Sequence, residues 1–91
     1  MNRKHVAQHL LVHLIRAQRQ GRRLNLQDLV DAIKVRRGDV RATLTMLHQQ
    51  GLYDVLRQRL TLLGFSVAMR VEHEPLPELR VAPKLRLVAA A

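Results

Sequence analysis

Cysteine is absent from this chain of 91 residues. Its absence excludes a disulfide framework, a cysteine-ligated zinc site and a thiol nucleophile. Long hydrophobic runs are absent too, since a membrane-spanning helix needs about 18 consecutive apolar residues and no run approaches that length. The first residues are basic, but Gln8, His9, His13 and Arg16 interrupt the apolar residues after them. We therefore expect neither a signal peptide nor a membrane span.

Acidic residues are scarce: 7 Asp and Glu stand against 16 Lys and Arg, for a formal charge of +9 with neutral histidines. Residues 1–60 hold 12 of the basic residues and 4 Asp, whereas residues 61–91 hold 4 basic and 3 acidic residues. Such a positive field attracts nucleic acid or an acidic membrane surface. Arginine outnumbers lysine 13 to 3. Guanidinium groups suit phosphate and guanine edges, although a GC-rich coding sequence would explain the same ratio.

The length fits one small domain, and an apolar content of 47% indicates a folded core rather than disorder. Three prolines, Pro75, Pro77 and Pro83, show that the end of the chain is not one continuous helix. We expect a domain at residues 1–74 and an extended or flexible tail at residues 75–91. We expect no attached ligand-sensing domain, because a chain of this size has no room for one.

Helical periodicity marks the first two segments of the sequence. Apolar residues at helical spacing predict a helix over about residues 3–20, which Gly21 ends. Asn25 is a good N-cap residue, and Asp28 places a carboxylate in the first turn of a second helix that should end near residue 34 or 35.

A third helix is predicted over residues 39–50, after a tight turn at residues 35–38. Val40, Leu44 and Leu47 fall on one stripe of this helix, which predicts that they face the core.

The stretch from Leu26 to Asp54 resembles winged helix-turn-helix transcriptional regulators. The recognition helix of that family has a β-branched residue, two leucines at helical spacing, and a glycine followed by two apolar residues and a charge. The matching residues here are Val40, Leu44, Leu47, Gly51, Leu52, Tyr53 and Asp54. In addition, Leu60-Thr61-Leu62-Leu63-Gly64 is similar to the Leu-Thr-x-x-Gly that follows the wing in several such families. The resemblance covers about half of the chain. It implies a mainly α, tri-helical domain whose third helix enters the major groove of DNA.

The exposed side of the third helix would then read bases, and the preceding turn would contact the DNA backbone. The expected base-reading residues are Arg41, Ala42, Thr45 and Gln49. Arginine suits guanine, glutamine suits adenine, and threonine and alanine can contact the thymine methyl group. The expected phosphate contacts are Arg36 and Arg37 on the turn, with Arg22 and Arg23 before the second helix.

The region of the wing departs from the family pattern. A wing is a β-hairpin whose turn is usually rich in glycine, asparagine or aspartate, yet no Gly, Pro or Asn lies between Tyr53 and Leu63. Leucines and valines recur at helical spacing from Leu52 to Val71. We therefore favour a fourth helix over about residues 54–71 in place of a normal wing, with a short wing as the alternative.

Such a helix would carry a second apolar stripe of Leu62, Phe65 and Met69. An exposed stripe often marks an interface. We expect a homodimer through it, which would place two recognition helices on one palindromic site. The alternative is that the tail folds back over the stripe with Leu76, Leu79 and Val81.

Two histidine-containing groups are candidate chemical sites. His5, His9 and His13 are spaced for one helix face, but no cysteine or glutamate joins them locally, so we expect a histidine row without a metal ion. Glu72-His73-Glu74 precedes two prolines and does not resemble an acid–base pair in an active site. We expect no enzyme activity and no cofactor.

The sequence therefore predicts a small, cytoplasmic, nucleoid-associated regulator of the prokaryotic type that binds double-stranded DNA as a homodimer, with a possible protein partner and no membrane. The first alternative is a protein-interaction module that uses the Leu62, Phe65 and Met69 stripe within a larger assembly. The second is a sequence-independent nucleic-acid coater, against which Tyr53 and Phe65, the only aromatic residues, argue because both fall at expected core or interface positions.

Overall fold

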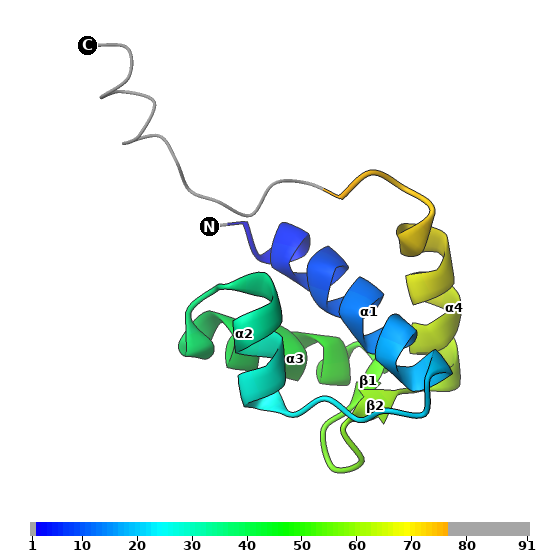
Figure 1. Cartoon of the computed structure of the whole chain (residues 1–91), viewed down its shortest axis with the longest axis horizontal. Helices are drawn as coiled ribbons and strands as arrows, with labels where there is room; N and C mark the ends of the chain where they lie inside the picture. The colour runs from blue at the N-terminus through cyan, green and yellow to red at the C-terminus, as the bar shows by residue number, and fades with distance from the viewer. Residues whose placement is uncertain (1, 77–91) are drawn as a thin grey trace, which may run out of the picture.

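The computed structural model describes residues 2–76 of the chain. Its elements, in order, are helix α1 (Arg3–Arg19), α2 (Leu26–Ile33), α3 (Arg37–Gln49), strands β1 (Tyr53–Asp54) and β2 (Arg59–Leu60), and helix α4 (Leu62–Glu72) (Figure 1). The predicted mainly α fold is confirmed. Leu79, Val81 and nearly all of the predicted tail lie outside the described residues.

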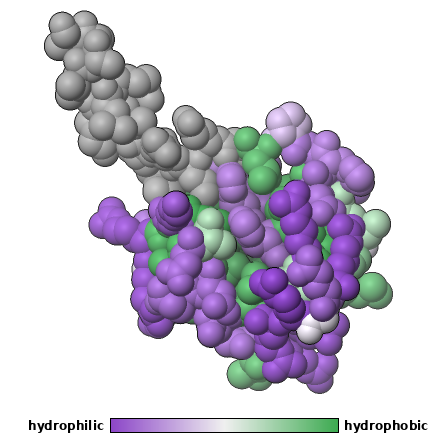
Figure 2. Space-filling view, viewed as in Figure 1, coloured by the Kyte–Doolittle hydropathy of each residue, from purple (hydrophilic) through white to green (hydrophobic). Residues whose placement is uncertain are grey.

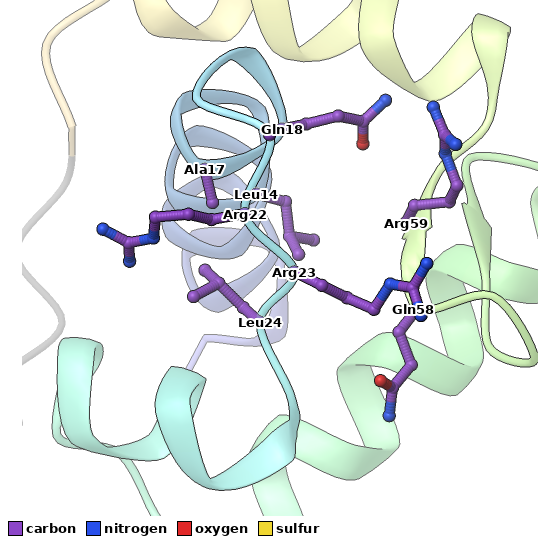
Figure 3. Close-up of a pocket in the computed structure, with 9 residues that line it drawn as sticks. Leu14, Ala17, Gln18, Arg22, Arg23, Leu24, Gln58 and Arg59 are labelled. Carbon is purple, nitrogen blue, oxygen red and sulfur yellow. The ribbon is translucent and has the colours of Figure 1, made fainter.

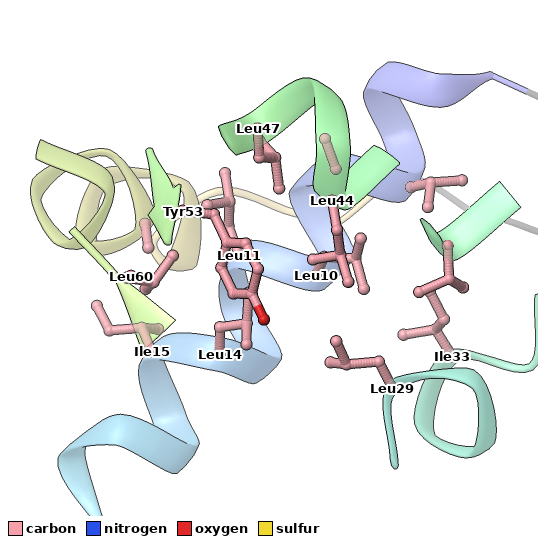
Figure 4. Packing of buried hydrophobic residues seen from close by; sticks show 14 of the residues in the cluster. Leu10, Leu11, Leu14, Ile15, Leu29, Ile33, Leu44, Leu47, Tyr53 and Leu60 are labelled. Atoms are coloured by element: carbon pink, nitrogen blue, oxygen red, sulfur yellow. The ribbon is translucent and has the colours of Figure 1, made fainter. Parts of the chain in front are cut away.

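Helix α1 forms the centre of the core. It contacts α2, α3, α4 and β2, and Val6, Leu10 and Ile15 are completely buried. Side chains from α2, α3 and both strands surround it (Figure 4). The periodic apolar positions therefore form the predicted first helix, because only a helix of that register turns them all towards neighbouring elements.

The second helix begins where the sequence predicts. The Asn25 Oδ1 atom accepts a hydrogen bond from the backbone N–H of Asp28 at 2.8 Å, and the Asp28 carboxylate accepts one from the backbone N–H of Asn25 at 3.0 Å. This reciprocal capping box satisfies amides that have no partner within the helix.

The turn before α3 is shorter than predicted. Lys34 takes a left-handed conformation with φ of 56°, which ends α2, and α3 already starts at Arg37. Arg37 therefore belongs to the first helical turn rather than to the preceding loop. Gly38 is likewise helical, so the turn consists of residues 34–36.

The predicted fourth helix over residues 54–71 is wrong. Strands β1 and β2 form a short antiparallel hairpin in which Tyr53 pairs with Leu60 and Asp54 with Arg59, and the helix starts only at Leu62. Tyr53 and Leu60 are each 3% exposed. Burying both against the core outweighs the helical spacing of the leucines, which is a weak preference by comparison.

The hairpin turn manages without glycine, asparagine or proline. The Asp54 carboxylate accepts hydrogen bonds from the backbone N–H groups of Leu56 and Arg57 at 3.0 and 3.1 Å. Gln58 takes the left-handed conformation, with φ of 55°, that glycine or asparagine more often supplies. The Asp54 side chain therefore stabilises the turn.

The segment Leu60-Thr61-Leu62-Leu63-Gly64 joins β2 to α4 and is fixed by hydrogen bonds. The Thr61 hydroxyl donates to the carbonyl of Gly51 at 2.6 Å and accepts from the backbone N–H of Gly64 at 3.0 Å. It thus caps α4 and ties it to the end of α3. A Cβ atom on Gly64 would lie 1.8 Å from the carbonyl oxygen of Leu52, so the two segments approach as closely as only glycine permits.

The C-terminal end of α4 is held to α1 by charge. The Glu72 carboxylate accepts from Arg19 Nη1 at 2.6 Å and from Arg16 Nε at 3.3 Å. The hydrogen bond from Arg19 lowers the pKa of Glu72 below its ordinary value of 4.5, partial desolvation opposes the shift, and Arg16 adds to it.

We expect Gly64→Ala to destabilise the domain by about 1–3 kcal/mol or more, because a packed backbone cannot move as a side chain can. Gly38→Ala is the matched control: it also lies in a helix, but its Cβ would meet nothing within 4 Å. Urea unfolding followed by circular dichroism would measure both. Equal stabilities of the two variants would contradict this close approach.

The lowered pKa of Glu72 predicts acid sensitivity. A carboxyl group whose pKa is lowered by folding stabilises the domain above its unfolded pKa, and that contribution is lost as the pH falls through the folded pKa. We expect stability to fall below about pH 4.5 and Glu72→Gln to flatten this dependence. Glu74→Gln removes the same charge from a residue that pairs with no side chain within residues 2–76 and should leave the dependence unchanged. Urea unfolding over a pH series would compare the three proteins.

Candidate nucleic-acid interface

Helix α3 buries one side and exposes the other. Val40, Thr43, Leu44 and Leu47 are buried, so the predicted inward stripe is confirmed. Arg41, Thr45 and Gln49 are exposed, while Ala42 is half-buried. The four predicted base-reading residues therefore lie along the side of α3 away from the core, as the helical repeat requires.

The polar groups on this face differ in how far they are already engaged. The Thr45 hydroxyl donates to the carbonyl of Arg41 at 3.0 Å, which leaves its methyl group and its acceptor capacity for a ligand. The Arg41 guanidinium forms no hydrogen bond or ion pair within residues 2–76. Its guanidinium is therefore free to donate to an external acceptor.

Arg36 and Arg37, the predicted phosphate contacts, are exposed at the start of α3. Arg36 Nε lies 3.8 Å from the Asp39 carboxylate. Arg37 donates to the side-chain oxygen of Gln27 on α2, and the Gln27 amide donates in turn to Asp31 at 2.9 Å. Both side chains are thus positioned by polar neighbours at the edge of the α3 face.

Arg22 and Arg23 leave the loop between α1 and α2 in opposite directions (Figure 3). Arg23 points towards Gln58 and Arg59 of the hairpin, whereas Arg22 points away from them. A cavity of about 160 Å³ lies between this loop, the end of α1 and the hairpin. Its lining is Leu14, Ala17, Gln18, Gly21, Arg22, Arg23, Leu24, Gln58 and Arg59.

Sequence reasoning did not bring Arg59 to the same cavity as Arg23, because the predicted helix over residues 54–71 would include Arg59. The available signal was the Leu60-Thr61-Leu62-Leu63-Gly64 segment, whose resemblance implies a hairpin before it. Neither Arg23 nor Arg59 pairs with an acidic side chain within residues 2–76. Two unneutralised guanidinium groups at one cavity favour an anion between them.

The hairpin connects the α3 face to this cavity. On the β1 side, His48 Nδ1 lies 3.0 Å from the carbonyl oxygen of Tyr53. On the β2 side, the backbone N–H of Leu60 donates to the Gln18 side chain at 3.0 Å. Burial, and secondarily the neighbouring Asp54 carboxylate, raises the pKa of Tyr53, as expected for a phenol held in the core. The two short strands are thus anchored to α3 and α1.

The predicted interface stripe on α4 divides into two parts. Leu62 is 86% and Met69 43% exposed. Phe65 is half-buried and packs against the core, with the Arg19 guanidinium 5.9 Å from its ring centre. Leu63, 57% exposed, adds to the open surface instead.

The remaining candidates are the histidine row of α1 and the Glu72-His73-Glu74 segment. Within residues 2–76, no three His, Asp or Glu side chains gather as a metal site would require. Burial, and then the charges of Arg16 and His9, lowers the pKa of His13. Glu72 is committed to its two arginines.

Among the described residues, no helix combines the length and the apolar character needed to cross a membrane.

The candidate site consists of the α3 face, the arginines at its edge, and the hairpin with the cavity that Arg23 and Arg59 line. Comparison with protein-family models, with curated proteins and with solved structures finds no match for this chain.

Proposed function

We propose that this chain is a small, sequence-specific regulator that binds double-stranded DNA through a helix-turn-helix of the winged type. The order α1, α2, α3, hairpin and α4 supports this interpretation, with α2 and α3 as the helix pair and β1 and β2 as a short wing. The predicted helix over residues 54–71 would have left no wing, whereas the β1–β2 hairpin can contact DNA as one.

The observation that carries the proposal is the free face of α3. Arg41 and Gln49 offer the donor and acceptor groups that distinguish guanine and adenine in the major groove, and neither side chain forms a hydrogen bond or ion pair within residues 2–76. An α-helix is about 10–12 Å wide with its side chains, and the major groove of B-DNA is about 12 Å wide. A face with this chemistry on an otherwise compact helix is suited to base recognition.

Phosphate binding would surround this face. Arg36 and Arg37 lie at the N-terminal end of α3, where unpaired backbone amides also favour an anion. Arg23 with Arg59 offers a second phosphate site, and Arg22 a more separate one. Such contacts fix the position of the helix on DNA and give affinity without sequence preference.

We further propose a homodimer through α4, with Leu62, Met69 and Leu63 as its apolar contact surface and Phe65 as the supporting core residue. Two copies would place two α3 helices on one palindromic site. We retain the cytoplasm, at the nucleoid, as the proposed location.

A second candidate function is a protein-interaction module. The apolar α4 surface favours it, since Leu62, Leu63 and Met69 all remain exposed on this one helix. In vitro selection from random duplexes separates the two functions. Enrichment of one motif supports the regulator, and a flat outcome at physiological salt supports the interaction module.

We expect Arg41→Ala to reduce discrimination between the selected duplex and random duplex by about 1–3 kcal/mol. Arg37→Ala should weaken binding to all duplexes alike and reduce the salt dependence. Arg70→Ala is the matched control, because it removes the same charge from an exposed position on α4. Fluorescence anisotropy at several salt concentrations would measure all three, and equal effects of Arg41→Ala and Arg37→Ala would contradict the assigned roles.

We expect Leu62→Asp to convert a dimer to a monomer, because it places a charge in the proposed apolar contact without touching the core. Light scattering would report the mass. Ala32→Asp introduces the same charge at an exposed position on α2 and should leave the dimer intact. An unchanged mass of Leu62→Asp would exclude this interface.

A further inference from the structure

We infer that the hairpin carries an apolar wedge, Leu56, which enters the minor groove of DNA and bends the duplex. This inference rests on the proposed function and adds to it a deformation of the DNA. It begins from the exposure of Leu56: at 92% this leucine is the most exposed large apolar side chain among the described residues.

Leu56 lies at the tip of the β1–β2 hairpin. It lies in the turn that joins β1 to β2, and this turn projects from the body of the domain at the bottom of Figure 1. A small hydrophobic patch appears at the same place in Figure 2, within a largely hydrophilic surface. Val55, 40% exposed, is its apolar neighbour in sequence.

The tip is held in a defined shape. Asp54 accepts from the backbone N–H of Leu56 and fixes the start of the turn, and Gln58 takes the left-handed conformation that closes it. The strands below are anchored by the buried side chains of Tyr53 and Leu60. A side chain that must separate stacked bases needs such a rigid support, because a flexible loop would move aside instead.

Charge indicates what this tip contacts. Arg57 follows Leu56 in the turn and Arg59 begins β2, and both are exposed. Arg57 Nε lies 3.8 Å from Asp54, while Arg59 pairs with no acidic side chain within residues 2–76 and lines the cavity that Arg23 also lines. Cations beside an apolar tip match the polyanionic rims of a narrow groove, into which arginine is readily drawn.

The anchoring of the hairpin to α3 indicates which groove is reached. His48, near the end of α3, holds β1 through the Tyr53 carbonyl, so the tip follows α3 as one body. With α3 in the major groove, a loop projecting beyond it reaches the neighbouring minor groove. Apolar side chains inserted there between base pairs unstack them and kink DNA by about 20–90° towards the major groove.

The experiment is ligase-catalysed cyclisation of a duplex of about 120 base pairs, shorter than the persistence length of DNA of about 150 base pairs. Binding to the same duplex is measured in parallel by anisotropy. We expect the wild type to increase circle formation at least about tenfold by bending the duplex. Leu56→Ala should abolish most of this increase and reduce affinity by less than about tenfold, since the arginine contacts remain.

Two further variants make the comparison specific. Leu56→Met keeps a long apolar tip and should retain the bending. Leu76→Ala truncates an exposed leucine outside the hairpin, 37% exposed and beyond the end of α4, and should also retain it. Circular dichroism would show that all variants fold, as expected for side chains outside the core.

Failure of the wedge differs from failure of the proposed function. Tight binding without cyclisation, or full cyclisation by Leu56→Ala, overturns the wedge and leaves the regulator standing. Absence of any duplex binding by the wild type overturns both. Leu56-dependent binding to vesicles of anionic phospholipid, without cyclisation, overturns the wedge in favour of a lipid surface.

Discussion

The packing of the three other helices and of β2 against α1 is the constraint on which this fold depends. Eight residues of α1 are buried, and α2, α3, α4 and β2 all contact it. In a domain this small no second core is available. Each surrounding element therefore turns one apolar side towards α1 and leaves its other side to solvent, and this is why α3 keeps a long polar face free.

The few acidic residues are largely used inside the domain. Asp28 completes the capping box, Asp31 holds Gln27, and Asp39 lies near Arg36. Asp54 closes the hairpin turn, and Glu72 joins α4 to α1. Several arginines are consequently left without an acidic partner within residues 2–76: Arg37 and Arg41 on α3, Arg22 and Arg23 on the α1–α2 loop, and Arg59 on the hairpin. The carboxylates thus stabilise the fold through hydrogen bonds and ion pairs, and the arginines without an acidic partner form the positive surface of the domain.

Sequence reasoning failed between residues 54 and 60, and the reason is physical. Leucines at a spacing of three or four suit a helix, but the same spacing does not say which of them a core can accept. The core accepts Tyr53 and Leu60, one on each strand, and leaves Leu56 outside. The turn forms without glycine because the Asp54 carboxylate accepts hydrogen bonds from backbone N–H groups within it. The local spacing of leucines does not show which side chains the core will bury.

The sequence alone determined the features that depend on neighbours along the chain: the first three helices, the Asn25 and Asp28 cap, and the inward stripe of α3. These arise from periodicity and from hydrogen bonds over three or four residues, which need no distant partner. Only the tertiary structure decided that residues 53–60 form a hairpin, that Phe65 supports the core, and that Arg59 lies at the same cavity as Arg23. Each of these depends on a contact between segments far apart in the chain, where burial and close approach rather than local preference select the conformation.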